Sequence, residues 1–127
     1  MAESFLNHYG KGFLLAKSAG THPELVNNFA IRVMEEMGID MMHNRSNHVD
    51  EFASESFDYV ITVCDNAKEN CPYIPATIKN IHQAFTDPAK AIGSESEQLI
   101  VYRRVRDEIN EYTKEFVRKI ISGSEEE

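Results

Sequence analysis

The feature that most constrains the fold is the segment 57–64, which reads Phe-Asp-Tyr-Val-Ile-Thr-Val-Cys. Its residues are mostly β-branched or aromatic, which favours a strand over a helix. A strand with one exposed face alternates apolar and polar residues, whereas this run is nearly continuous, as is typical of parallel strands buried on both faces. Parallel strands need crossover connections, which are usually helices, so the segment predicts an α/β sandwich with a mostly parallel sheet.

Helical and extended patterns alternate along the rest of the chain, which supports this fold class. Gly38 is the predicted stop of the second helix, because glycine readily takes the left-handed conformation that follows many helices. The other predicted elements are a helix over residues 1–9, a short buried strand over 13–16, a helix over 23–37, a short helix before residue 55, a strand over 79–85 and a helix over 94–121.

The last predicted helix is long and amphipathic, with apolar residues at helical spacing. We expect residues 1–121 to form one α/β domain and residues 122–127 to be a solvated acidic tail. The predicted apolar face of the long helix consists of Tyr102, Val105, Ile109, Tyr112, Phe116 and Ile120.

Charge and cysteine content exclude several classes of protein. The formal net charge is −8 and the Lys and Arg residues are scattered, whereas a nucleic-acid surface needs clustered positive charge. No apolar run approaches the roughly 20 residues of a membrane-spanning helix, and no signal-peptide pattern opens the sequence. The two cysteines are too few for a disulfide-stapled secreted domain. We therefore expect a cytoplasmic protein that binds neither nucleic acid nor membrane and keeps its thiols reduced at rest.

The two cysteines are the first candidate functional residues. Cys64 ends the predicted strand, and Cys71 follows seven residues later, just before Pro72. One interpretation is two small apolar residues in a core. The other is a redox pair. A helical connection would hold their α-carbons roughly 10 Å apart, whereas a disulfide needs less than about 7 Å. Disulfide formation would then require the connecting loop to rearrange.

Asp87 is the third candidate. It precedes Pro88, and Asp-Pro is common in turns, so a turn aspartate is one interpretation. The other is a general acid on a loop, which protonates a leaving oxygen. The five histidines show no spacing typical of a metal site, since His43 and His48 have no third ligand nearby in the sequence. We expect no metal and no bound cofactor.

The candidate residues belong to a longer ordered pattern. Cys64 ends the stretch 58–64, Cys71 precedes Pro72, and Asp87-Pro88-Ala89 follows. Further stretches are Met1-Ala2-Glu3, Ser18-Ala19-Gly20, Gly38-Ile39-Asp40, Arg45-Ser46, Gly93-Ser94-Glu95 and Arg103-Arg104-Val105-Arg106-Asp107-Glu108-Ile109. From residue 1 to about residue 116 the chain resembles the thioredoxin-coupled arsenate reductases of the low-molecular-weight protein tyrosine phosphatase fold. That fold is a three-layer α/β sandwich with a central parallel sheet.

The resemblance implies a relay of three cysteines acting on arsenate or a phosphate-like oxyanion. A first cysteine attacks arsenate, the cysteine matched by Cys64 attacks the first, and the one matched by Cys71 closes a disulfide that thioredoxin reduces. Asp87 matches the general acid of the family. Glu3 and Ser18 match positions that some members use for a potassium ion, but Asn47 stands where those members carry an acidic ligand. We expect a monomer.

The resemblance also implies a missing part. In the family, Met-Ala-Glu directly follows the first strand and a Cys-x-x-Asn-x-x-Arg-Ser loop, and this chain holds neither. We therefore expect the 127 residues alone not to turn over arsenate. Three interpretations stay open. The gene product starts upstream and is an arsenate reductase; the chain is a non-enzymatic remnant or thiol-bearing binding module; or a complete form is chiefly a low-molecular-weight protein tyrosine phosphatase.

Overall fold

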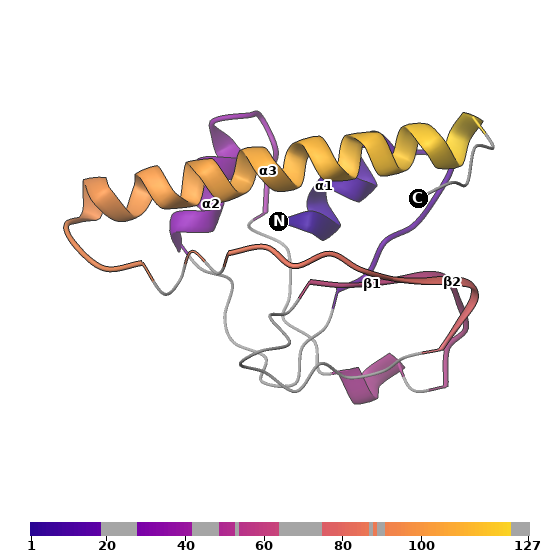
Figure 1. Ribbon diagram of the computed structural model, residues 1–127. Helices are drawn as coiled ribbons and strands as arrows, with labels where there is room; N and C mark the ends of the chain where they lie inside the picture. The colour runs from indigo at the N-terminus through magenta and orange to yellow at the C-terminus, as the bar shows by residue number, and fades with distance from the viewer. Residues whose placement is uncertain are drawn as a thin grey trace. The chain divides into compact units, whose positions relative to one another are not determined.

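The computed structural model describes residues 1–18, 28–41, 49–52, 54–63, 75–86, 88 and 91–122. They fall into two compact units, which we describe separately. The helical unit spans residues 1–18, 25–45 and 87–127, and the strand unit spans residues 19–24 and 46–86. The described elements are α1 (Ala2–Tyr9), α2 (Asn28–Glu35), η1 (Val49–Phe52), β1 (Phe57–Thr62), β2 (Ala76–His82) and α3 (Glu95–Ser122), as Figure 1 shows.

The core of the helical unit lies where α1 and α2 pack against α3. Figure 1 shows α2 beside the first half of α3 and α1 beside the second half. The Tyr9 hydroxyl at the end of α1 donates a hydrogen bond to Asn110 of α3. Each helix places its most buried side chains in this core, so the three helices stabilise one another. The largest fully buried side chains are Phe5, Met34, Val33, Val105 and Thr113.

The buried face of α3 agrees with the predicted one only in its first half. Tyr112 and Phe116 were predicted to be buried, but they are only partly covered and stack on each other with ring centroids 6.4 Å apart. After Ile109 the buried residues are four positions apart, at Thr113 and Val117, and residues with this spacing lie on one face of a helix. Thr113 is buried there because its hydroxyl donates to the Ile109 carbonyl at 2.8 Å. The observed buried residues of α3 are Leu99, Tyr102, Val105, Ile109, Thr113 and Val117.

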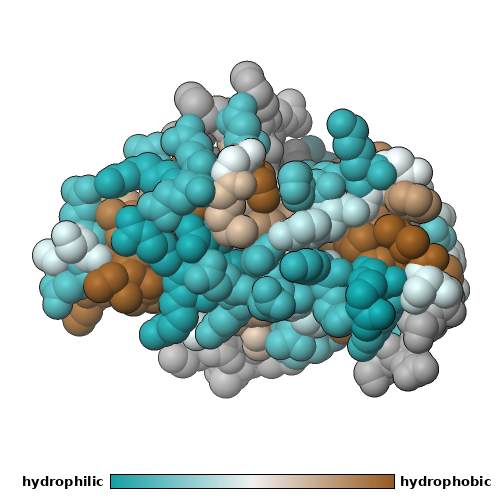
Figure 2. All heavy atoms as spheres, turned by 90° about the horizontal axis from the view of Figure 1, so that it is seen from above, coloured by the Kyte–Doolittle hydropathy of each residue, from teal (hydrophilic) through white to brown (hydrophobic). Residues whose placement is uncertain are grey.

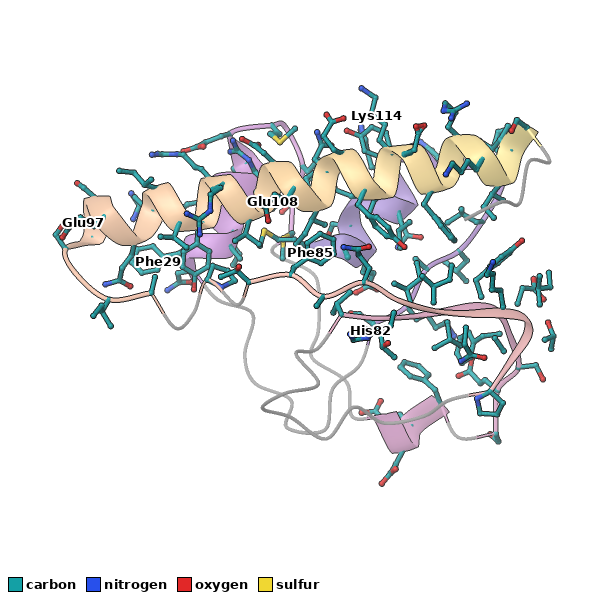
Figure 3. The ribbon with its side chains drawn as sticks, viewed as in Figure 1. Phe29, His82, Phe85, Glu97, Glu108 and Lys114 are labelled. Atoms are coloured by element: carbon teal, nitrogen blue, oxygen red, sulfur yellow. The ribbon has the colours of Figure 1, made fainter. Side chains whose placement is uncertain are left out.

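The outward face of α3 is polar. Figure 2 looks onto the side along which α3 runs and shows it mostly hydrophilic, with apolar atoms in small groups. At the start of α3, Ser94 and Glu97 form a capping box. The Ser94 N–H donates to Glu97 Oε1 at 2.8 Å, and the Glu97 N–H donates to Ser94 Oγ at 3.2 Å (Figure 3). Among the described residues, no helix is both long and apolar enough to cross a membrane.

Gly38 closes α2, as the sequence predicts. The Ile39 N–H donates to the Met34 carbonyl at 3.1 Å, and the Gly38 N–H donates to the Glu35 carbonyl at 2.9 Å. These two hydrogen bonds are those of a Schellman motif. They require a left-handed residue, and Gly38 has a φ of 78°. Ile39 and Met34, which flank the motif, are both buried.

We predict that Gly38→Ala destabilises the chain by about 1–2 kcal/mol, because an L-residue in the left-handed region crowds its own backbone. A Cβ at Gly38 would meet nothing within 4 Å, so the cost comes from the φ angle alone. Urea unfolding of the purified chain measures it. An unchanged urea midpoint would show that this helix end adopts another conformation.

Glu36, directly after α2, ties that helix to α3. Arg103 donates from Nη2 to Glu36 Oε2 at 2.8 Å, and Arg106 donates from Nη1 to Glu36 Oε1 at 2.8 Å. Arg106 also donates to the Val33 carbonyl at 2.9 Å, which satisfies a carbonyl in the last turn of α2. The hydrogen bond from Arg103 and then that from Arg106 lower the pKa of Glu36 to about 2.

This pKa predicts an acid-sensitive part of the stability. Because the folded-state pKa lies below the ordinary value of 4.5, the Glu36 contribution is present above pH 4.5 and is lost as the pH falls towards 2. We therefore expect the stability difference between the parent chain and Glu36→Gln to shrink over this range. Urea unfolding at several pH values measures it, with Glu35→Gln as a control for charge removal. A difference that stays constant down to pH 2 would contradict the prediction.

Residues 13–16, predicted to be a buried strand, do not form one. Phe13 is 70% exposed and Leu15 is 78% exposed. The Asn7 side chain takes the place of a neighbouring strand: its Nδ2 donates to the Ala16 carbonyl at 3.1 Å, and its Oδ1 accepts from the Ala16 N–H at 2.8 Å. Ser18 Oγ then donates to Glu3 Oε1 at 2.6 Å. The segment therefore runs back along α1 instead of entering a sheet.

In the strand unit, β1 and β2 pair in parallel, which confirms the predicted α/β class with a parallel sheet. The register begins at Phe57↔Ala76 and ends at Thr62↔His82, with an irregularity near Phe57. The last predicted strand, 79–85, lies three residues too late, because β2 spans Ala76–His82. The start of β2 is set by Pro75, which immediately precedes it and has no N–H to donate to a neighbouring strand. Its end is set by its partner, because β1 ends at Thr62, which pairs with His82.

Candidate functional site

The candidate site lies at the carboxyl ends of β1 and β2. Thr62 and His82 are partners in the register and are the last residues of their strands. Open α/β sheets bind their ligands beyond the carboxyl ends of the strands. In the sequence, Cys64 comes two residues after Thr62 and Asp87 comes five residues after His82. Both strands therefore end at the same edge of the sheet, and in the sequence each is followed within five residues by one of the predicted site residues.

Thr62 connects the two strand ends through its backbone and its side chain. Its carbonyl accepts a hydrogen bond from the Gln83 N–H at 2.8 Å. Its Oγ1 lies 2.7 Å from His82 Nδ1 and 3.4 Å from the Ile81 carbonyl oxygen. Figure 3 labels His82 at the end of β2. We call Thr62 and His82 the strand-end pair.

The three residues predicted to carry the chemistry, Cys64, Cys71 and Asp87, lie outside the described residues. Asn47, which bears on the potassium comparison, lies outside them as well. Within the described ranges, no three His, Cys, Asp or Glu side chains gather as they would around a metal ion. Glu3 and Ser18 are described and are hydrogen-bonded to each other.

Sequence reasoning missed the strand-end pair. The histidines were considered only as metal ligands, and the sequence alone does not give the register that places His82 opposite Thr62. One signal was available: Thr62 stands two residues before a candidate cysteine in a predicted strand, and His82 lies in the next predicted strand. Polar residues near the carboxyl ends of two neighbouring parallel strands are candidates for one site.

Comparison with known proteins identifies the family. Residues 1–125 match the low molecular weight phosphotyrosine protein phosphatase family. The chain belongs to this family. The arsenate reductase of Shouchella clausii (strain KSM-K16) is 39% identical over 116 residues, which are 91% of this chain and 84% of that protein. The arsenate reductase of Bacillus subtilis (strain 168) is 37% identical over 116 residues, with the same two shares.

Solved structures agree with this assignment. A solved arsenate reductase in the phosphate binding state matches this member of the phosphatase family with a TM-score of 0.77 and 29% identity, covering 94% of this chain and 86% of that chain. These matches confirm the resemblance that the short sequence motifs indicate. The chain is similar to arsenate reductases with the low-molecular-weight phosphatase fold.

Proposed function

We propose that this chain carries the second and third thiols, Cys64 and Cys71, of the cysteine relay of an arsenate reductase. The observation that carries the proposal is the 39% identity to the Shouchella clausii arsenate reductase over 91% of this chain. The parallel strand ends support it, because Cys64 and Asp87 follow the ends of neighbouring strands in the sequence. Such strand ends are where α/β proteins hold their reacting groups.

The relay is a two-electron reduction in which each step forms one bond to sulfur. A first cysteine thiolate displaces water or hydroxide from arsenate and forms a sulfur–arsenic bond. The Cys64 thiolate then attacks that sulfur, and the electron pair of the broken bond reduces arsenic and leaves with arsenite. The Cys71 thiolate attacks the Cys64 sulfur, frees the first cysteine and closes the Cys64–Cys71 disulfide. Two electrons and two protons from a reductant restore both thiols.

Two further roles and the setting of the reaction complete the proposal. Asp87 acts as the general acid that protonates the departing oxygen. Thioredoxin is the reductant, and no metal or bound cofactor takes part. The protein acts as a monomer in the cytoplasm, where thiols are kept reduced between turnovers.

A gain-of-activity experiment tests the proposal. The 127 residues hold no Cys-x-x-Asn-x-x-Arg-Ser motif, so the first thiol must be supplied. We define the loop fusion as this chain with an apolar strand and that motif placed directly before Met1. We expect it to form arsenite from arsenate repeatedly with thioredoxin and thioredoxin reductase. The same fusion with Ser in place of the motif cysteine is the control. No arsenite from a folded loop fusion that binds phosphate would contradict the proposal.

The family assignment favours a second candidate, a phosphatase acting on phosphotyrosine. Ester hydrolysis needs the motif cysteine, its arginine and a general acid, but no second or third thiol. Hydrolysis of a phenyl phosphate that is much faster than arsenate reduction by the same loop fusion would favour the phosphatase.

A further inference from the structure

Residues 13–16 have the sequence of a strand but are not part of a sheet. They read Phe-Leu-Leu-Ala, and the side chains of Phe13 and Leu15 are largely exposed. In an extended backbone, side chains two positions apart lie on the same side. An exposed apolar segment of this kind is able to pair its backbone with that of another chain. The hydrogen bonds of its backbone therefore decide whether it does so.

The Asn7 side chain occupies both backbone groups of Ala16. Its Oδ1 accepts from the Ala16 N–H at 2.8 Å, and its Nδ2 donates to the Ala16 carbonyl at 3.1 Å. Residues directly opposite each other in antiparallel strands exchange two hydrogen bonds of the same kind, one to the N–H and one to the carbonyl. A single carboxamide therefore satisfies both groups through which Ala16 could join a ladder.

Two further contacts hold the segment against α1. The Leu14 N–H donates to the Gly10 carbonyl at 2.9 Å, in the turn that follows α1. The Ser18 hydroxyl donates to Glu3 Oε1 at 2.6 Å. This second contact joins two side chains, so its loss leaves the backbone hydrogen bonds of the segment in place. It separates a general weakening of the attachment to α1 from an effect specific to Asn7.

We propose that Asn7 keeps residues 13–16 from pairing with the same residues of a second copy of this chain. A second copy is the partner because a segment that pairs with itself about a twofold axis is self-complementary. Such pairing also removes the exposed Phe13 and Leu15 side chains of both copies from water. Without the carboxamide, the segment leaves α1 and a ladder between the copies satisfies Ala16. This role is independent of the proposed relay, because Asn7 takes no part in thiol chemistry.

Self-association of the 127-residue chain, measured by sedimentation equilibrium, is the first test. The parent should be monomeric, because its association must first break both hydrogen bonds to Asn7. Each such hydrogen bond is worth a factor of about five. We therefore expect Asn7→Ala to associate about tenfold to thirtyfold more strongly. Asn7→Asp keeps an acceptor for the Ala16 N–H but loses the donor to its carbonyl, so its association should rise only about fivefold.

Hydrogen exchange of the Ala16 amide, followed by NMR, tests the same idea at one residue. In the parent this amide should exchange slowly at every protein concentration, because it is bonded to Asn7. In Asn7→Ala it should exchange fast in dilute protein and more slowly as the concentration rises, because the second copy then supplies an acceptor. A general loss of stability would speed exchange at every concentration.

Three variants separate pairing from destabilisation. Gly38→Ala destabilises the chain at the end of α2, and it should leave self-association unchanged. Ser18→Ala removes the side-chain contact to α1 and should also leave it unchanged. Leu15→Lys, added to Asn7→Ala, should restore the monomer, because a lysine on a strand edge opposes pairing. Circular dichroism of each variant confirms that it is folded.

Several results would overturn the role of Asn7. One is a folded Asn7→Ala variant that is as monomeric as the parent. Equal association in Gly38→Ala would mark the effect as one of lost stability, and association that Leu15→Lys does not reverse would place the contact elsewhere. A parent that already associates through residues 13–16 would also contradict the proposal. None of these results bears on arsenate reduction by the loop fusion, so the proposed function is decided separately.

Discussion

Cys64→Ser is expected to abolish arsenate reduction by the loop fusion, lowering arsenite formation by at least about a thousandfold, as removal of a nucleophile typically does. Without the Cys64 thiol, the sulfur–arsenic bond on the first cysteine has no second thiol to break it, so no electron pair reaches arsenic. The measurement is arsenite formed per minute with thioredoxin and its reductase in excess.

Cys71→Ser should act one step later. Cys64 still attacks the first cysteine and releases one arsenite, but the resulting disulfide joins Cys64 to the motif cysteine and does not move on. We therefore expect about one arsenite per protein in the first turnover and little afterwards. Both serine variants should hydrolyse phenyl phosphate within about twofold of the parent fusion, because that reaction uses neither thiol. Sustained arsenate turnover in either variant would remove that residue from the relay.

The largest expected effect on stability comes from Phe5→Ala in α1. Phe5 is 0% exposed and packs in the core between α1 and α3. Truncation of a buried aromatic ring typically costs about 3–5 kcal/mol through lost transfer free energy and the cavity left behind. Since a domain has only about 5–15 kcal/mol of net stability, we expect a large fall in the urea midpoint of unfolding.

Phe13→Ala is the matched control, because it makes the same chemical change at a ring that is 70% exposed. Its cost should stay within about 0.5 kcal/mol. The comparison also tests the conformation of residues 13–16. If this segment were a buried strand, as the sequence alone predicts, Phe13→Ala would be nearly as destabilising as Phe5→Ala.

The elements that the sequence predicts well are those that carry a local signal. The β-branched run before Cys64 predicts β1 because few other structures accommodate it, and Gly38 ends α2 because its φ of 78° favours glycine. The long apolar stripe predicts α3 to within one residue at each end. Each of these signals lies within the element itself.

Where the prediction fails, hydrogen bonds that the apolar pattern does not reveal decide the outcome. Ala16 finds its hydrogen bonds on Asn7, nine positions earlier, so an apolar segment that reads as a strand is not one. The end of β2 follows from its partner β1 rather than from its own residues. On α3, Thr113 takes a buried position that hydrophobicity gives to Tyr112, because its hydroxyl bonds within the helix.

The candidate site also contains residues that the sequence predicts and residues that only the structure reveals. Spacing and resemblance pick out Cys64, Cys71 and Asp87, which lie outside the described residues, so their roles stay predictions. The pairing of Thr62 with His82 was not predictable, because the register of two parallel strands depends on the connection between them and on their shared surroundings. Only the structure brings these two side chains within 2.7 Å.

The thiol relay is tested most directly by a single turnover of the loop fusion without thioredoxin. The fusion is mixed with arsenate, quenched in acid, alkylated and analysed by mass spectrometry, and arsenite is measured in the same sample. The relay predicts one arsenite per protein, a disulfide between Cys64 and Cys71, and an alkylated motif cysteine. Arsenite formed while Cys64 and Cys71 both remain free thiols would contradict it.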